Sequence, residues 1–154
     1  MSTITEHVDV EVPVRTAYDQ WTQFEEFPRF MEGVEEVRQI DDTHVHWRTK
    51  IAGVEREFDT EITEQHPDHR VAWRSTAGAE NAGVVTFHRL DDDKTRVTVQ
   101  IDIEPEGVVE KAGDALGLAK RRVKGDLGRF KELIESQGTE TGAWRGNVEE
   151  ERTA

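Results

Sequence analysis

The sequence predicts an α+β fold in which a curved antiparallel sheet of seven strands wraps around one long C-terminal helix. Apolar residues recur every three or four positions over 107–137, which is the repeat of one helix face. Between residues 34 and 104, apolar and polar residues alternate in short segments separated by turn signals, as in antiparallel strands with one buried face. The helix must bury its apolar stripe, and the apolar face of the sheet is the available partner.

Residues 4–31 are expected to form one strand followed by two short helices. Residues 4–12 alternate in the manner of a half-buried strand. Pro13 ends this strand and suits the first turn of a helix, whose apolar spacing continues to Phe24. A second short helix or turn over 27–31 completes a helical elbow, which we define as residues 14–31.

Six further strands are predicted between the elbow and the long helix. Short segments rich in Asp, Gly or Pro join them, and these residues favour tight turns. The predicted strands are 34–40, 45–51, 54–65, 71–75, 84–90 and 95–103. Because side chains alternate between the two faces of a strand, Trp47, Phe58 and Trp73 fall on the same, inward face.

The last predicted element is the helix over 107–137. Its polar face carries lysine and arginine, so we expect a surface helix with one buried stripe. Residues 138–154 lose all periodicity. The sequence therefore predicts one domain over residues 1–137 and a flexible C-terminal tail over 138–154.

Composition disfavours several classes of function. With 33 acidic and 20 basic residues, the net charge of −13 repels nucleic acids and anionic lipid surfaces. Cysteine is absent, which excludes disulfides and thiol nucleophiles and is compatible with a reducing cytoplasm. No charged leader with an apolar run opens the sequence, and no segment reaches the length of a membrane span. We expect a cytoplasmic protein without stable membrane insertion or nucleic-acid binding.

Three stretches of the chain carry a family resemblance. They read VPVRTAYDQWTQFEEFPRFMEGVEEV, GAENAGVVTFHRL and TRVTVQIDIEPEG. With the order of the predicted elements, they resemble the START-like (SRPBCC) superfamily and within it the bacterial polyketide cyclase/dehydrase and coenzyme Q-binding group. The resemblance runs from about Ile4 to Gln137 and implies the helix-grip fold, with a hydrophobic small molecule held between sheet and helix. Some such relatives are aromatases, cyclases or lipid and quinone carriers, but no single catalytic motif defines the group, so no catalytic residue is carried over.

A ligand cavity is therefore expected between the sheet and the long helix. The aromatic side chains of the strands and the elbow either line this cavity or fill the core. Residues 27–31 form an apolar segment suited to gate one open end. The candidate ligand-binding residues are Tyr18, Phe27, Phe30, Met31, Trp47, Arg56, Phe58, Trp73 and Phe87, with Val109, Ala112 and Leu116 from the helix.

Arg56 is the most informative polar candidate, because strand parity places it on the inward face between Val54 and Phe58. An unpaired charge buried there would be costly. Arg56 therefore either anchors a carboxylate, phenolate or carbonyl group of a ligand, or forms a structural ion pair with Glu64 or Glu110, or extends to the sheet edge.

Neither a catalytic set nor a metal site emerges from the sequence. His44 and His46 share a strand face that is predicted to point outward, and zinc needs three or four converging ligands. Tyr18 and His88 are the candidate acid and base groups, but His88 falls on the face opposite to Phe87. We therefore expect no catalytic residue, no metal and no cofactor.

Three functions remain open at this point. The favoured one is the binding or carriage of a small hydrophobic molecule, such as a lipid, a quinone or a polyketide-like compound. A polyketide-type aromatase, cyclase or dehydratase would use the same cavity, but it needs a titratable group within hydrogen-bond reach of its ligand. The third is a protein-interaction module with a filled core. The basic cluster over 120–124 is then either a solvated helix face or a contact surface for anionic lipid or a partner.

Overall fold

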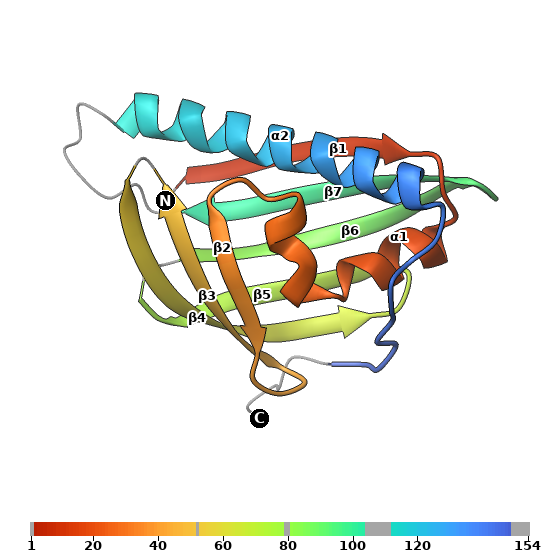
Figure 1. Cartoon of the computed structure of the whole chain (residues 1–154), viewed down its shortest axis with the longest axis horizontal. Coiled ribbons are helices and arrows are strands. Elements are labelled where there is room, and N and C mark those ends of the chain that lie inside the picture. Colours follow the sequence, from red (N-terminus) through yellow and green to blue (C-terminus); the bar gives the residue numbers. More distant parts are fainter. Residues whose placement is uncertain (1, 52, 79–80, 104–111, 149–154) are drawn as a thin grey trace.

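The protein is one curved antiparallel sheet closed on its concave side by helices. The computed structural model describes residues 2–51, 53–78, 81–103 and 112–148. Figure 1 shows the sheet curling beneath the long C-terminal helix, with the two short helices of the elbow on the same side. The α+β class and the helix-grip fold predicted from the sequence are confirmed.

The elements follow the predicted order. The chain begins with β1 (Ser2–Val10), α1 (Val14–Trp21) and the 3-10 helix η1 (Phe24–Arg29). Six strands follow, and they are β2 (Val34–Gln39), β3 (His44–Ile51), β4 (Val54–His66), β5 (Arg70–Ala77), β6 (Asn81–Asp91) and β7 (Lys94–Ile103). The last helix is α2 (Ala112–Gln137). The strand limits agree with the prediction to within a few residues, and β6 departs most because it begins at Asn81 rather than at residue 84.

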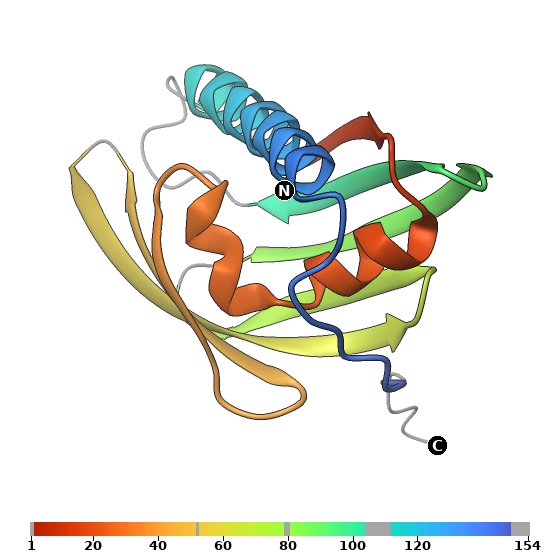
Figure 2. The same cartoon turned by 45° about the vertical axis from the view of Figure 1, so that its right-hand side comes forward.

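The sheet is a meander with one strand added from the N-terminus. Its strand order is β1-β7-β6-β5-β4-β3-β2, and every neighbouring pair is antiparallel. β1 pairs with β7 along its whole length, from Ser2 opposite Ile103 to Val10 opposite Thr95. The elbow connects β1 to β2 and lies between the concave face of the sheet and the end of α2, as Figure 2 shows.

Strand parity decides which side chains enter the core. Phe87 on β6 is 3% exposed, whereas its neighbour His88 lies exposed on the outer face. The helix contributes Leu127, Phe130 and Ile134, which are buried and spaced by three or four residues. The concave face and the stripe of α2 therefore form one core, as predicted.

The convex face of the sheet is charged and pairs residues of opposite sign across β3 and β4. The cross-strand pairs are His44 with Glu61, His46 with Asp59, Arg48 with Glu57 and Lys50 with Glu55. Directly opposite side chains of opposite charge attract one another and keep this face in water. The acidic character of the protein is thus compatible with a stable antiparallel sheet.

The N-terminal part of the long helix is described only in part. Of the predicted range 107–137, residues 107–111 lie outside the described residues, and Val109 with them. The backbones of Ala112 and Leu116 are helical, but their side chains also lie outside the described part of the structure. None of the helices in the described ranges is both long and apolar enough to cross a bilayer.

The segment after α2 differs from the flexible tail that the sequence predicts. Arg145 Nη1 donates to Asp19 Oδ1 at 2.6 Å, and the backbones of Val148 and Gln65 exchange two hydrogen bonds. Residues up to 148 thereby lie against the domain. Their contacts are polar or made by the backbone, and a search for apolar periodicity does not detect such contacts.

Candidate functional site

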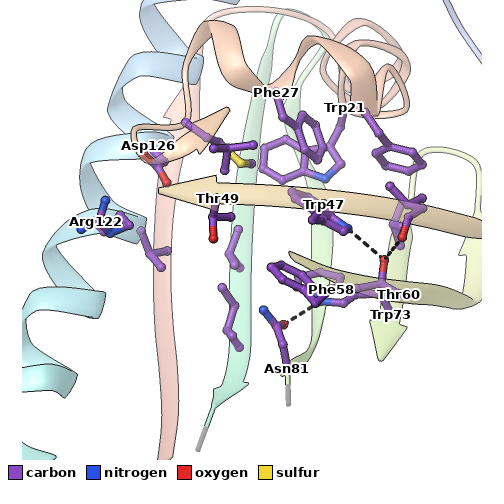
Figure 3. Close-up of a pocket in the computed structure, with 18 of the residues that line it drawn as sticks. Trp21, Phe27, Trp47, Thr49, Phe58, Thr60, Trp73, Asn81, Arg122 and Asp126 are labelled. Atoms are coloured by element: carbon purple, nitrogen blue, oxygen red, sulfur yellow. Dashed lines mark hydrogen bonds between the residues drawn. The ribbon is translucent and has the colours of Figure 1, made fainter. Parts of the chain in front are cut away.

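A cavity of about 510 Å³ lies between the concave face of the sheet, the elbow and α2 (Figure 3). The elbow contributes Trp21, Phe24, Phe27 and Met31 to its wall. The strands contribute Val34, Val45, Trp47, Thr49, Val54, Arg56, Phe58, Thr60, Ile62, Val71, Trp73, Asn81, Val99 and Ile101, and α2 contributes Arg122, Val123, Asp126 and Leu127. Its volume falls within the range of about 300–1,000 Å³ that is usual for small-molecule sites.

Trp47 forms the centre of the aromatic part of the wall. Its ring stacks on Phe58 with centroids 5.8 Å apart and an angle of 7°, and it meets Phe27 at 5.7 Å on the elbow. The indole Nε1 donates to Thr60 Oγ1 at 3.0 Å, as the dashed line in Figure 3 indicates. Because the polar end of the indole is satisfied within the wall, its ring presents an apolar surface to the cavity.

Trp73 is held in a similar way by residues of β6. Its Nε1 donates to Asn81 Oδ1 at 2.9 Å. The ring lies against Gly83, where an added Cβ would approach Trp73 Cζ2 to 2.8 Å and the Gln100 carbonyl oxygen to 2.6 Å. Only glycine leaves room for the indole at this point. Sequence analysis missed Gly83, although an isolated glycine inside a strand indicates such a close approach.

Most of the predicted site residues on the strands and in the gate segment line the cavity. Those in its wall are Phe27, Met31, Trp47, Arg56, Phe58 and Trp73. Tyr18, Phe30 and Phe87 instead belong to the packed core outside the lining. Tyr18 meets Phe87 edge to face at 5.4 Å, and Phe30 meets Phe130 at 5.2 Å. The elbow inserts its own aromatic rings at this end and fills it, so that inward-facing residues there do not reach the cavity.

Arg56 occupies the inward face of β4, as predicted, and lines the cavity, but it is exposed rather than buried. It lies near the β3–β4 turn, opposite Thr49 in register. Val54, two residues closer to that turn, is 52% exposed although it too lines the cavity. The tip of the hairpin thus forms an open end of the cavity, where a guanidinium group keeps its contact with water.

A polar group on α2 also reaches the wall, and sequence analysis did not identify it. Asp126 Oδ1 accepts hydrogen bonds from the backbone N–H of Glu32 at 3.0 Å and from Arg129. Its side chain is 15% exposed, and burial raises the pKa of this carboxyl group despite the nearby Arg129. One turn earlier, Arg122 Nη1 donates to the carbonyl oxygen of Glu32 at 3.3 Å. Both residues belonged to a face predicted to be solvated, yet they flank the inward Val123.

The candidate acid and base groups from the sequence do not reach the cavity. Tyr18 is fully buried in the core, which raises the pKa of its hydroxyl group, and His88 lies on the convex face. Among the described residues that line the cavity, Asp126 is the one carboxylic acid. The site can therefore enclose an apolar molecule and offer it a polar end near the helix and the hairpin tip.

The histidines of β3 form ion pairs on the convex face. His44 Nδ1 lies 2.9 Å from Asp41 Oδ1, and His46 Nδ1 lies 2.6 Å from Asp59 Oδ1. Within the described ranges, no group of three or more His, Asp or Glu side chains is placed to hold a metal ion.

Solved structures share this fold over most of the chain. A protein from Thermus thermophilus has a TM-score of 0.78 at 16% identity and covers 90% of this chain and 100% of its own. The Zhui aromatase/cyclase from Streptomyces sp. R1128 has a TM-score of 0.74 at 13% identity, with coverages of 93% and 99%. A START superfamily protein from Mycobacterium smegmatis has a TM-score of 0.70 at 14% identity, with coverages of 85% and 98%. At these identities the likeness concerns the fold alone.

The sequence has a much closer relative. It is 61% identical over 149 residues to an uncharacterized 17.2 kDa protein in the melC2-rnhH intergenic region of Streptomyces lincolnensis, a match that covers 96% of this chain and 99% of that protein. A family described as polyketide cyclase/dehydrase and lipid transport matches residues 10–132, a range that includes every residue of the cavity wall named above. The chain therefore belongs to the polyketide cyclase/dehydrase and lipid transport family, which confirms the resemblance seen in the sequence.

Proposed function

We propose that this protein binds and carries a small hydrophobic molecule, such as a lipid, a quinone or a polyketide-like compound, in the cavity between the sheet and α2. The observation that supports this most directly is a cavity of about 510 Å³ with a mainly apolar and aromatic wall. An interaction module with a filled core would need side chains to occupy this space. Here the aromatic rings of Trp47 and Trp73 line it instead.

The wall favours a ligand with a flat or greasy body and one polar end. The stacked rings of Trp47 and Phe58 and the indole of Trp73 offer apolar faces for the body. The polar end would lie towards Arg56 on the hairpin and Asp126 on the helix, where the cavity has its charged groups. Phe27, Met31, Trp47, Arg56, Phe58 and Trp73 are thus the ligand-binding residues that we propose.

A second candidate function is aromatase, cyclase or dehydratase chemistry in the same cavity. The position of Asp126 favours it, since a carboxyl group in the wall with a raised pKa can exchange a proton with a ligand near neutral pH. The carrier function does not require that exchange. Carriage remains the better supported function, because the described wall contains no second acid or base to complete a pair with Asp126 other than the arginines Arg56 and Arg122.

Binding of a neutral apolar dye tests the carrier function. We expect N-phenyl-1-naphthylamine to bind the wild-type protein, to gain fluorescence in the cavity and to change the emission of Trp47 and Trp73. Val123→Phe adds bulk to the wall and should weaken binding by about tenfold or more.

Leu133→Phe is the matched control for this experiment. Leu133 lies on the same helix and is also partly buried against the core, but it is not part of the cavity wall. Dye affinity should be unchanged in this variant. Equal weakening by both substitutions, or no saturable binding by the wild-type protein, would contradict the proposed function.

A further inference from the structure

Residues 139–148, which we call the C-terminal strap, run from the end of α2 across the elbow towards the end of β4. In both Figure 1 and Figure 2 the strap passes beside α1 on the concave side of the sheet. It ends in a two-hydrogen-bond bridge between Val148 and Gln65, with N–O distances of 2.8 and 2.9 Å. Because β3 stops opposite Glu61, this bridge uses a part of β4 that β3 does not cover.

The strongest attachment of the strap is Arg145. Its Nη1 donates to Asp19 Oδ1 at 2.6 Å and its Nη2 donates to Asp68 Oδ2 at 2.8 Å. The side chain of Asp19 on α1 is 2% exposed, so Arg145 neutralises a buried carboxylate. The guanidinium carbon also lies 5.7 Å from the centre of the Tyr18 ring, in a cation–π arrangement. One residue of the strap thereby contacts both α1 and the β4–β5 turn.

A second group of contacts falls on the junction between α1 and η1. Gln20 Nε2 donates to Thr141 Oγ1 at 3.1 Å, and the Thr141 backbone N–H donates to Gln20 Oε1 at 2.9 Å. The hydroxyl group of Thr141 also bonds to Glu26. The Trp144 backbone N–H donates to Thr22 Oγ1 at 3.1 Å, at the C-terminal cap of α1. The strap therefore binds both sides of this junction.

The residues that the strap holds alternate with residues of the cavity wall. Trp21 lies between Gln20 and Thr22, and Phe24 and Phe27 lie on either side of Glu26. Trp21, Phe24 and Phe27 all line the cavity. Movement of the junction would therefore move the wall.

We infer that the C-terminal strap positions the elbow side of the cavity wall and so controls how fast a ligand leaves. This inference rests on the proposed ligand-binding function of the cavity. The elbow consists of a helix of eight residues and a 3-10 helix of six residues that contains Pro28. Helices this short are not stable by themselves, so their position depends on what packs against them. Release of the strap would lower the cost of opening this wall.

The test measures dye dissociation from the full chain by stopped-flow fluorescence with N-phenyl-1-naphthylamine. Thr141→Ala combined with Arg145→Met removes the side-chain attachments of the strap. We expect the dissociation rate to rise by about tenfold. Arg96→Met is the matched control, because Arg96 forms a similar two-bond ion pair with Asp9 between β7 and β1, away from the elbow. Its dissociation rate should equal that of the wild-type protein.

Arg145→Met leaves the buried Asp19 without its partner, so a variant that does not fold is replaced by Arg145→Met with Asp19→Asn. This pair removes both charges, and it should regain thermal stability while keeping fast dissociation. An unchanged rate in every folded strap variant would overturn the inference. If the wild-type protein does not bind the dye, the proposed function fails, and hydrogen exchange decides the inference. Exchange at Trp21 to Phe27 must then be faster in the strap variants, and unchanged exchange would overturn it.

Discussion

Arg56 lies at the point where the apolar wall of the cavity meets solvent. Its neighbour Phe58 is half-buried and stacks on Trp47, whereas Val54 on the other side is exposed. A guanidinium at such a boundary keeps its hydration while its stem covers apolar surface. It can therefore contact the polar end of a ligand without the large desolvation cost of a buried charge.

The substitution Arg56→Met keeps most of the side-chain bulk and removes the charge. Since Arg56 is exposed, the variant should fold normally. If it anchors the ligand, affinity for a long-chain carboxylate should fall by about 1.5–3 kcal/mol, the usual value of a charge-assisted hydrogen bond. Affinity for the matching hydrocarbon should stay the same, and isothermal titration calorimetry would measure both.

Arg48→Met is the appropriate control for this prediction. Arg48 lies on the neighbouring strand and faces outward, where it pairs with Glu35 and Glu36. The anchor role of Arg56 is wrong if both ligands lose affinity equally in Arg56→Met, or if that variant unfolds.

At single residues, the sequence could predict the direction of a side chain better than its surroundings. Alternation along β3, β4 and β5 correctly placed Trp47, Phe58 and Trp73 on one face. It could not distinguish the part of that face covered by the elbow, where Phe87 is packed, from the part that borders the cavity. Asp126 was missed because a carboxylate between basic residues on a helix is usually solvated.

Among the elements, α2 combines two roles along its length. Val123 and Leu127 border the cavity, whereas Phe130 and Ile134 are fully buried against the sheet and the elbow. Phe130 meets the rings of Trp21 and Phe30 at 5.1 and 5.2 Å. The C-terminal half of the helix therefore carries most of the packing, and the half near Val123 closes the site.

Two truncations on this helix should separate these roles. Phe130→Ala should lower the free energy of unfolding by about 3–5 kcal/mol, because it leaves a void in a packed aromatic cluster. Val123→Ala should cost only about 1 kcal/mol, since one side of Val123 already faces the cavity. Urea unfolding would measure both values. Similar losses in the two variants would show that the helix is packed uniformly.

The order of the elements was predictable because each one carries its own local signal of periodicity or turn chemistry. The strap carries no such signal. Its attachment depends on Arg145 meeting Asp19, which lies on a helix more than 120 residues away in the sequence. A polar contact at that separation leaves no trace in local patterning, so the segment was predicted to be flexible.

At the scale of the whole molecule, ion pairs tie the two ends of the sheet sequence together. Arg96 on β7 donates to both carboxylate oxygens of Asp9 on β1, at 2.8 and 3.2 Å. This hydrogen bonding lowers the pKa of Asp9, although partial burial opposes it. A carboxyl group whose pKa is lower in the folded state stabilises the fold above its unfolded pKa of about 3.9, and this contribution disappears as the pH falls through the folded value.

Asp9→Asn should therefore destabilise the protein near neutral pH and have no effect at about pH 2, where Asp9 is protonated in both states. Chemical unfolding of the two proteins across this range would measure the difference. In an Arg96→Met background the substitution should have little effect at any pH. A difference that persists at about pH 2 would mean that the introduced amide is destabilising for steric reasons.

The pairing of β1 with β7 also constrains how the chain reaches its native state. Ser2 lies opposite Ile103, so about 100 residues must be enclosed before the first strand finds its partner. The meander from β2 to β7 can form by local hairpins, one turn after another, but it remains open at β7 until the N-terminal segment returns. During synthesis β1 leaves the ribosome first and stays without its partner until β7 has emerged. The exposed edge of β7 is thus the place where an incomplete chain would pair with a second copy of itself.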